Sequence, residues 1–240
     1  MAITGHMAHS QHIRVVTYNI HQARGWDGAT RPDRIITVLR EVDADVIALQ
    51  EVLLAQVVLI KDALGIADVA FNLTRRLRSG LYGNVCLSRL PLTSHASYDL
   101  TYKKLVPRGC LRADVSHGAA SLHVFNVHLG LGYRERIQQV RMLREILDPR
   151  AMTGPRLLLG DFNEWFNGRA SRLLRKEFGD PCGRRRSLRT HPSPLPVFPL
   201  DRIYHAPDVT LERVAVHRSK VARAVSDHLP TYADFRLNLS

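Results

Sequence analysis

Apolar and polar residues follow one another in blocks that predict strands alternating with helices. Residues Ile13 to Asn19 alternate with the two-residue period of a β-strand. A proline and an acid at Pro32-Asp33 then mark a helix start, and the following residues give that helix one apolar face. A short apolar strand from Val46 to Leu49 ends in Gln50-Glu51, and a second amphipathic segment, about Ala55 to Leu64, stops at Gly65. The first part of the chain therefore predicts two strand–helix units.

The middle and the end of the chain are richer in strands. Turn residues separate four strand-like runs, typical of antiparallel strands: Gly83 to Ser88, Thr93 to Asp99, Gly109 to Ser116 and Ala119 to His128. A helix of about Tyr133 to Leu147, a strand from Arg156 to Gly160, a basic helix from Arg169 to Phe178 and a Pro- and Arg-rich loop from Gly179 to Pro199 follow. The last predicted strands are Leu200 to His205, Thr210 to His217 and Thr231 to Leu237.

We expect one domain over residues 13–238, because no linker-like or repetitive segment divides the chain. Residues 1–12 are excluded from the fold, since Gly5-His6-Met7 resembles a cloning scar and the segment lacks a signal peptide's pattern. The longest apolar stretch, Val57 to Leu64, is interrupted by Lys61 and Asp62 and is too short to span a bilayer. A globular protein without a membrane span is therefore predicted.

Composition adds one unusual feature, a formal net charge of +12 from 34 basic and 22 acidic residues. A positive field of this size favours polyanions such as nucleic acid, an anionic lipid surface or phosphate esters. Codon bias is an equal explanation, because 29 of the 34 basic residues are arginine. The run Arg184-Arg185-Arg186 illustrates both readings, since it could steer a polyanion or be a solvated charge run.

Cysteine usage indicates a reducing compartment. The odd count of three, Cys86, Cys110 and Cys182, includes no CxxC pair, so a disulfide framework or a structural zinc site is not expected. Cys86 and Cys110 stand in strand-like runs and are interpreted as small buried apolar residues. We therefore expect a cytoplasmic protein, and no feature of the sequence indicates an obligate protein partner.

Polar side chains suited to chemistry fall where six apolar runs finish. These residues are Asn19, Glu51, His128, Asp161 with Asn163, Asp201, and Asp227 with His228. Two sets share one layout: a strand, a helix and a second strand join Asn19 to Glu51, and the same order joins His128 to Asp161. Binding sites in α/β proteins gather at strand ends, so we expect these side chains to form one site.

Carboxylates, amides and imidazoles dominate this set. Asn19 and Glu51 offer one neutral and one anionic oxygen, which suits Mg²⁺ or Mn²⁺. Two histidines beside such an ion can donate hydrogen bonds to phosphate oxygens, and a neighbouring aspartate can fix the tautomer of one histidine. Metal-assisted phosphoester hydrolysis is the reaction class that uses the whole set.

Six short motifs resemble, in order, those of the endonuclease/exonuclease/phosphatase superfamily, which includes deoxyribonuclease I, abasic-site endonucleases, neutral sphingomyelinases and inositol polyphosphate 5-phosphatases. The motifs are Val16-Thr17-Tyr18-Asn19-Ile20, Leu49-Gln50-Glu51, Asn126-Val127-His128, Gly160-Asp161-Phe162-Asn163, Asp201-Arg202-Ile203 and Ser226-Asp227-His228. The resemblance extends from Ile13 to about Leu237. It implies a four-layer α/β sandwich in which two mixed sheets pack face to face with helices outside.

The resemblance also implies a role for each motif residue. Asn19 and Glu51 match the metal-binding pair, with Asp227 close to the metal. His128 and His228 match histidines that contact the scissile phosphate, and Asp201 matches the acid that orients His228. Asp161 and Asn163 match the pair that positions the attacking water. Whether Asp161 or His228 takes the proton of the water is left open.

One departure separates the chain from several nucleases of this superfamily. They carry an acid before the middle strand, whereas Tyr82 to Arg89 contains none. This stretch, with Asn19-Ile20-His21 and Pro107-Arg108-Gly109, looks more like small stand-alone bacterial members. His21, Arg24 and Arg108 are candidate substrate contacts, although a surface position is an equal reading for Arg108.

The sequence thus predicts a metal-dependent phosphodiesterase that uses in-line water attack. Nucleic acid is slightly favoured as substrate, and a phospholipid or inositol phosphate is the alternative. Peripheral contact with anionic lipid would accompany the second reading. A catalytically inactive binding module is the rival from another class, although none of the six motifs is broken.

Overall fold

Two mixed β-sheets form the centre of the protein. The structure is a computed structural model that describes residues 11–118, 120–148, 150, 152–166, 168–180 and 188–237. The first sheet has the order β10-β11-β1-β2-β4-β3 and the second the order β5-β6-β7-β8-β9. The strands are β1 (Gln11–Asn19), β2 (Val46–Leu53), β3 (Asp68–Leu77), β4 (Gly80–Ser88), β5 (Leu92–Asp99), β6 (Gly109–His117), β7 (Ala120–His128), β8 (Arg156–Asp161), β9 (Asp201–His205), β10 (Val209–Val216) and β11 (Thr231–Leu237).

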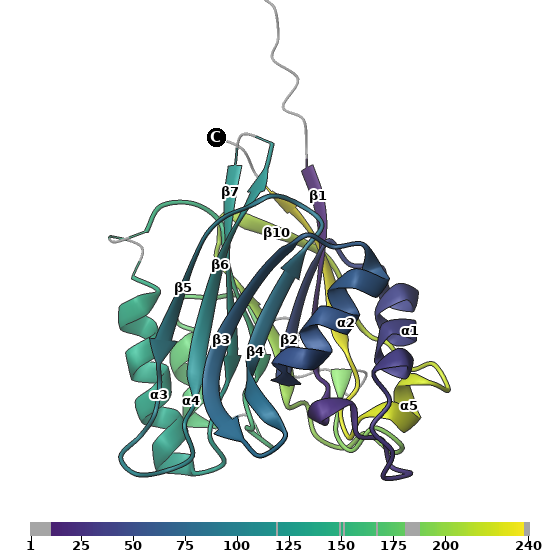
Figure 1. Ribbon diagram of the computed structural model, residues 1–240. Coiled ribbons are helices and arrows are strands. Elements are labelled where there is room, and N and C mark those ends of the chain that lie inside the picture. The colour runs from purple at the N-terminus through teal and green to yellow at the C-terminus, as the bar shows by residue number, and fades with distance from the viewer. Residues whose placement is uncertain are drawn as a thin grey trace, which may run out of the picture.

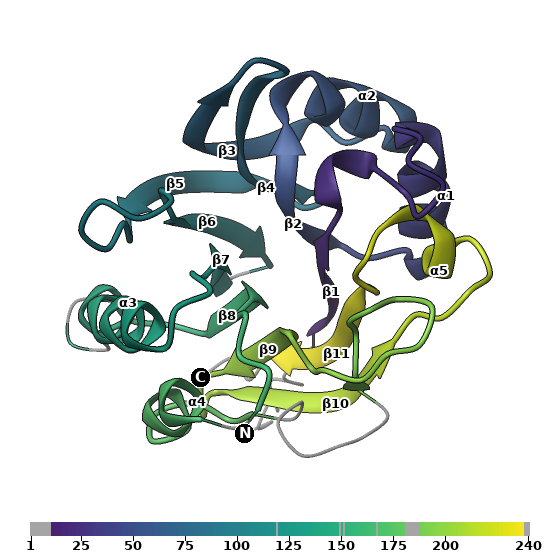
Figure 2. The same ribbon diagram turned by 90° about the horizontal axis from the view of Figure 1, so that it is seen from below.

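Helices cover the outer face of each sheet. The helices are α1 (Pro32–Val42), α2 (Leu54–Leu64), α3 (Tyr133–Ile146), α4 (Arg169–Leu174) and α5 (Ala222–Val225), with a 3₁₀ turn at His21–Ala23. α1, α2 and α5 lie beside the first sheet, and α3 and α4 lie beside the second (Figure 1, Figure 2). The expected four-layer α/β sandwich is therefore confirmed. No helix in the described part of the chain is long and apolar enough to cross a membrane.

Three clusters of buried apolar side chains fill the spaces between the four layers of the sandwich, one cluster in each space. Residues that alternate along a strand enter different layers: Ile47 and Leu49 of β2 pack toward the helices, and Val46 and Ala48 pack between the sheets. On β8, Leu158 faces the α3 side while its neighbours on the strand face the sheet interface. Strands buried on both faces explain why these runs are continuously apolar in the sequence.

A buried amide pair joins the two sheets. Gln50 of β2 donates from Nε2 to Asn126 Oδ1 of β7 at 2.7 Å, and to Thr17 Oγ1 at 3.1 Å. The Asn126 amide in turn donates to the Leu49 and Val85 carbonyls at 3.0 and 2.9 Å. Both amide side chains are fully buried. We call this pair the amide clasp; it fixes the two sheets relative to each other just behind the ends of β1 and β7.

Each sheet contains one parallel strand pair with the same layout. β1 pairs with β2 so that Asn19 stands beside Gln50, and β7 pairs with β8 so that His128 stands beside Asp161. α1 connects the first pair and α3 the second. The two similar half-units expected from the sequence are thus present, one per sheet.

Several predicted boundaries were wrong. β3 had no predicted counterpart, because this edge strand is half exposed and carries Arg75 and Arg76. β1 begins at Gln11 rather than Ile13, because its first two residues pair with the end of β11. α4 ends at Leu174 rather than Phe178, and the four-residue α5 was not predicted. Cys86 and Cys110 are free and buried, as expected. Residues 1–10, Cys182 and Arg184 to Arg186 lie outside the described residues.

Candidate active site

The polar residues predicted from strand ends converge at one edge of the sandwich, which we call the site edge. Asn19, His128 and Asp161 are the last residues of β1, β7 and β8. The prediction that Asp201, Asp227 and His228 also finish strands was wrong. Asp201 begins β9, and the other two precede β11. Because β9 and β11 run antiparallel to β8 and β1, their beginnings lie at the same edge as the ends of those strands.

Glu51 reaches the site from inside a strand rather than from its end. β2 continues to Leu53, and its pairing with β4 shifts register between Leu49 and Val52. Glu51 has a φ of +58° at this irregularity. A bulge of this kind changes the direction of a side chain and is favoured beside functional sites. The predicted strand end at Leu49 was therefore wrong, although the residue that it pointed to is at the site.

Asp161 stands at the centre of the cluster. Its Oδ2 lies 3.0 Å from Asn19 Nδ2, 3.5 Å from His128 Nε2 and 3.7 Å from His228 Nε2. Its Oδ1 accepts the backbone N–H of Asn163 at 2.9 Å. The Asn163 side chain donates to the Leu129 carbonyl at 2.9 Å. One buried carboxylate thus contacts groups from both sheets.

Asp201 and His228 form the tightest pair of the site. His228 Nδ1 lies 2.7 Å from Asp201 Oδ2, and both side chains are buried. Burial by itself would lower the pKa of His228, but the charges of Asp201 and Asp161 outweigh it and raise the pKa to about 10. His228 is therefore an imidazolium at neutral pH. The expected role of Asp201 in orienting His228 agrees with this geometry.

His128 and Asp161 are shifted in a different way. Burial, followed by the positive charge of Arg108 and of His228, lowers the pKa of His128 well below its ordinary value. Burial raises the pKa of Asp161 to about 6, although the positive charge of His228 opposes the rise. At neutral pH the site therefore holds a neutral His128, an ionised Asp161 and a charged His228.

The residues expected to hold a metal are partly brought together. Asn19 Nδ2 lies 3.4 Å from Glu51 Oε1, and His128 Nε2 lies 3.9 Å from the same oxygen. The Glu51 and Asp161 carboxylates thus flank Asn19, with His128 and His228 beside Asp161. This excess of hard oxygen donors fits a divalent cation. Asn19 Oδ1 accepts the His21 N–H at 3.0 Å, so the amide nitrogen faces the carboxylates here.

Asp227 stands apart from Asn19 and Glu51, in a second group. Its carboxylate lies 3.7 Å from His21 Nδ1 and 3.9 Å from His191 Nε2. His191, Asp227 and His228 could together offer three ligand atoms within 4.8 Å of one another. The positive charge of His228 opposes a cation at this second position, so the oxygen-rich group at Glu51 is the better candidate metal site.

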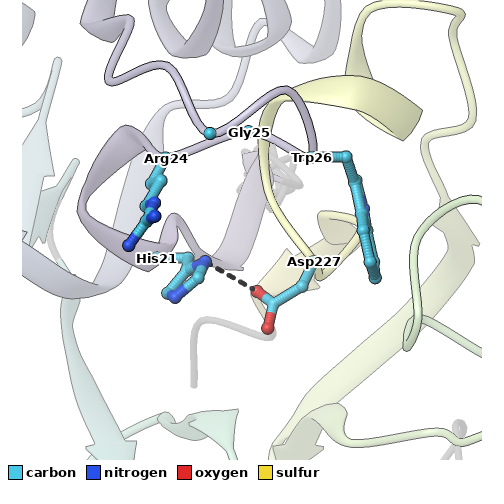
Figure 3. Close-up of a pocket in the computed structure, with 6 residues that line it drawn as sticks. His21, Arg24, Gly25, Trp26 and Asp227 are labelled. Carbon is cyan, nitrogen blue, oxygen red and sulfur yellow. Dashed lines mark ion pairs between the residues drawn. The ribbon is translucent and has the colours of Figure 1, made fainter.

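A pocket of about 250 Å³ opens beside Asp227 and contains two of the predicted substrate contacts. Figure 3 shows Arg24 and Trp26 extending from either side of Gly25, with His21 and Asp227 below them. Trp26 is mostly exposed, but its Nε1 donates to Ser193 Oγ at 2.9 Å, so the indole is held as a wall of the pocket. Arg24 is exposed and makes no ion pair with a described residue.

A strained turn presents His21 and Arg24 to this pocket. His21, Gln22 and Ala23 have φ values of +46°, +54° and +58°, a left-handed conformation that L-residues rarely adopt. The buried Gln56 of α2 holds the turn, because its Nε2 donates to the Gln22 carbonyl at 2.6 Å. Strain of this kind persists where the surrounding structure fixes it, and it clusters at functional sites.

Arg108 lies away from His21 and Arg24. It lines a separate hollow of about 530 Å³ between β3 and the loop that joins β5 to β6. Its charge nevertheless acts on His128. The structure therefore places Arg108 on the His128 side of the site.

Sequence reasoning missed His191 and the function of two motif amides. The His191 ring lies 4.9 Å from the His228 ring, and its backbone pairs with Phe198 in a short bridge. It falls in the segment predicted only as a loop, and no periodicity marks it. Gln50 and Asn126 were part of recognised motifs, and their side chains form the amide clasp.

The fold and the site define a class of protein: α/β sandwiches in which polar residues from two mixed sheets meet at one edge. The chain belongs to the Endonuclease/Exonuclease/phosphatase family, whose model matches residues 16–228. The three activities in the name of the family all cleave phosphoester bonds.

The similarity to other proteins covers nearly the whole chain. The uncharacterized protein YbhP of Escherichia coli K12 is 29% identical in sequence, and the match covers 93% of this chain and 96% of the YbhP chain. The Bacteroides thetaiotaomicron mannosyl-6-phosphatase matches with a TM-score of 0.77 at 20% identity, covering 93% of this chain and 99% of that chain. D. rerio TDP2, complexed with single strand DNA product, gives a TM-score of 0.72 at 19% identity, with 93% and 98% covered. The two structural likenesses concern the fold.

Proposed function

We propose that the protein is a divalent-metal-dependent phosphodiesterase that attacks phosphate in line with water. The observation that carries this proposal is the position of Asp161 between His128 and His228, of which the first is neutral and the second positively charged. An ionised carboxylate can take a proton from water, and an imidazolium can stabilise negative charge on phosphate oxygens. Both groups lie within 4 Å of each other in a buried site.

The geometry supports Asp161 as the group that accepts the proton of the attacking water. The charges of Asp201 and Asp161 raise the pKa of His228, which favours its protonated form and suits it to donate rather than accept a proton. Asp201 holds His228 in this charged form. Asn163 fixes Asp161 through its backbone N–H, and we assign it the role of positioning the water together with Asp161. His128 would donate a hydrogen bond to a phosphate oxygen.

Glu51 and Asn19 are the residues that we assign to the metal; Asp227, the third residue expected there, lies in the second group with His21 and His191. The Glu51 carboxylate suits Mg²⁺ or Mn²⁺, and Asn19 would offer Oδ1 to the ion by turning over its amide, whose oxygen accepts the His21 N–H in this structure. When bound, the ion would supply positive charge that polarises the phosphate. The structure supports Glu51 most directly, since it is the acid of this pair and points to the site from a bulge.

The observations support a class of substrate, a phosphate ester, rather than one compound. The net charge of +12 suits polyanionic substrates, and the DNA product bound to D. rerio TDP2 supports nucleic acid as one of them. The activity in the name of the Bacteroides phosphatase supports a small phosphate ester. We assign His21 and Arg24 to the group beyond the scissile phosphate, because both line the pocket next to Asp227. Arg108 would add positive charge on the opposite side.

The free buried thiols of Cys86 and Cys110 support a reducing compartment, and we place the protein in the cytoplasm. Burial raises the pKa of the Cys86 thiol to about 12, so this thiol is not poised to react.

Metal dependence is the first test of the proposal. Excess EDTA should abolish hydrolysis of bis-p-nitrophenyl phosphate, and Mg²⁺ or Mn²⁺ should restore it. Glu51→Gln should raise the Mg²⁺ concentration needed for half-maximal rate, because it removes the formal charge of the metal-binding pair. The same preparation should be assayed on plasmid DNA, RNA, phospholipids and sugar phosphates. Undiminished turnover of any of these esters in EDTA would contradict the proposal.

A further inference from the structure

Large apolar side chains are exposed around the mouth of the site. Of the thirteen such side chains exposed in the described part of the chain, eight stand on five loops at the site edge, and a ninth, Tyr133, begins α3 directly after one of these loops. They include the three most exposed, Leu195, Phe166 and Leu131, at 75%, 74% and 70%. We call these nine residues the apolar rim: Trp26, Leu105, Val106, Leu131, Tyr133, Trp165, Phe166, Leu195 and Val197.

Strand register places all five loops at one edge. The loops follow β1, β7 and β8, join β5 to β6, and precede β9. Asp99 pairs with Gly109 at the end of β5, and Asp161 pairs with Asp201. In Figure 1 these loops lie at the lower end of the molecule, and Figure 2 shows them facing the viewer.

The opposite edge provides a comparison within the same molecule. Its connections, such as residues 43–45, 89–91 and 206–208, carry none of the thirteen exposed side chains among their described residues. Of the other four, Leu54 begins α2 directly after β2, and Val58, Leu59 and Leu73 lie further along α2 and β3. Isolated exposed apolar residues are normal on a protein surface, but a concentration at one edge marks a site of interaction.

Basic side chains stand between the members of the apolar rim. Lys103 and Lys104 are exposed directly before Leu105, and Arg134 is exposed directly after Tyr133. Arg24 is exposed two residues before Trp26. Of the acids on these loops, Asp27 is paired with Arg34 at 2.5 Å. Aromatic and aliphatic residues mixed with lysine and arginine are typical of surfaces that bind the interface of an anionic membrane.

We propose that the apolar rim docks the site edge onto an anionic lipid bilayer, and that the phosphoester hydrolysed is in a phospholipid headgroup. The inference rests on the proposed phosphodiesterase function and names its substrate class. Apolar side chains enter the boundary between headgroups and acyl chains, while the basic residues contact lipid phosphates. Docked in this way, Asp161 and His228 face the layer in which those phosphates lie.

A membrane fits the rim better than a protein partner does. The apolar side chains stand on connections of both sheets at the site edge: Trp26 follows β1 of the first sheet, and the others lie next to strands of the second. A protein seated on all five loops would cover the pocket that His21, Arg24 and Asp227 line next to His228. A bilayer on the same face supplies the substrate instead.

The first experiment measures binding without turnover. The protein in EDTA is sedimented with vesicles of phosphatidylglycerol and phosphatidylcholine, and with vesicles of phosphatidylcholine alone. We expect binding to the anionic vesicles that weakens with salt, and about a hundredfold weaker partitioning for the double variant Phe166→Ala/Leu195→Ala, about tenfold per side chain. Val58→Ala/Leu59→Ala, which removes exposed apolar side chains from α2, should bind like the wild type.

The second experiment separates this inference from the proposed function. In Mg²⁺, both double variants should hydrolyse bis-p-nitrophenyl phosphate at the wild-type rate, whereas only the rim variant should lose hydrolysis of phosphatidylglycerol in vesicles. No binding to anionic vesicles at low salt, or equal binding by the rim variant, would overturn the docking surface while leaving the phosphodiesterase intact. Vesicle binding with no metal-dependent hydrolysis of any ester would overturn the proposed function, and the phospholipid substrate with it, while leaving the docking surface intact. Saturable capture by another protein through the rim in place of vesicles would also reject the bilayer.

Discussion

His128 and His228 show how one type of side chain takes two charge states in a single site. Both rings are buried, and burial disfavours the charge on each. His228 keeps its proton because Asp201 accepts from Nδ1 at 2.7 Å. His128 faces Arg108 and the charged His228, which add to the effect of burial. The difference between the two histidines therefore arises from their neighbours.

The catalytic importance of this pair can be measured by double mutation. His228→Ala should lower kcat by about 10² to 10⁴, the range for a positioned charged or proton-transferring group. Asp201→Asn should cost less, and it should cost little more when combined with His228→Ala, because Asp201 acts through that ring. Steady-state kinetics on bis-p-nitrophenyl phosphate give the comparison. Additive losses would show a separate role for Asp201.

The raised pKa of His228 also predicts how stability depends on pH. The folded value of about 10 lies above the unfolded value of about 6.5, so protonation of His228 favours the folded state. Its stabilisation is complete below pH 6.5 and is lost as the pH rises toward 10. The difference in unfolding free energy between wild type and His228→Gln should therefore shrink between pH 6 and pH 9 in urea titrations with EDTA. A difference that grows with pH would contradict this assignment. In an Asp201→Asn background, the same difference should depend less on pH.

The common edge of Asn19, His128 and Asp161 could be predicted, because each ends a strand of a parallel pair. The reason that Asp201, Asp227 and His228 join them could not, because it depends on the antiparallel direction of the strands that they begin or precede. The position of Glu51 inside β2 could not, since a bulge depends on pairing with β4 rather than on local sequence. His191 could not either, because its approach to His228 follows from a loop conformation. The amide orientation of Asn19 is likewise set by the His21 N–H.

At the scale of elements, the left-handed turn after β1 depends on its support from α2. Gln56 is buried and uses both ends of its amide: Nε2 donates to the Gln22 carbonyl, and Oε1 accepts the Leu53 N–H at 3.1 Å. Three consecutive residues at positive φ have an energetic cost, on the order of 1–3 kcal/mol each. The turn therefore needs contacts such as these to persist.

Removing the support should affect both stability and substrate binding. Gln56→Ala leaves buried backbone groups without partners and should lower the unfolding free energy by about 1–3 kcal/mol. It should also raise KM more than it lowers kcat, because His21 and Arg24 line the pocket but lie outside the Asp161 cluster. Urea unfolding and steady-state kinetics test both expectations. Gln138→Ala on α3, whose amide oxygen accepts from Arg141 near the surface, is the matched control and should change stability by less than about 0.5 kcal/mol.

Burial along most of an element helps the prediction of its bounds. β8 and α3 show strong apolar patterns, and their predicted bounds agree with the structure within one residue. β3 shows little pattern, because an edge strand exposes many side chains. α5 spans a single turn and is held by its tertiary surroundings, so no local pattern indicates it.

At the scale of the whole molecule, we infer that residues 13–238 unfold as one unit. The apolar layer between the sheets and the amide clasp both link the half-units. The two tryptophans report on different sheets, because Trp26 follows β1 and Trp165 follows β8. Fluorescence of Trp26→Phe and of Trp165→Phe should therefore show unfolding midpoints in urea that each coincide with the midpoint from circular dichroism of the same variant. Separate midpoints within either variant would indicate two independently stable parts.

The amide clasp has a further consequence for anyone who engineers this protein. Asn19 and Glu51 stand on one side of the seam between the sheets, and His128 and Asp161 stand on the other. A slip of one sheet against the other by about 1 Å would misalign these groups and can cost about 10² in rate, while the spectrum of the folded protein stays the same. Turnover is thus a finer gauge of sheet alignment than melting temperature. Libraries that alter the seam should be ranked by rate rather than by thermal tolerance.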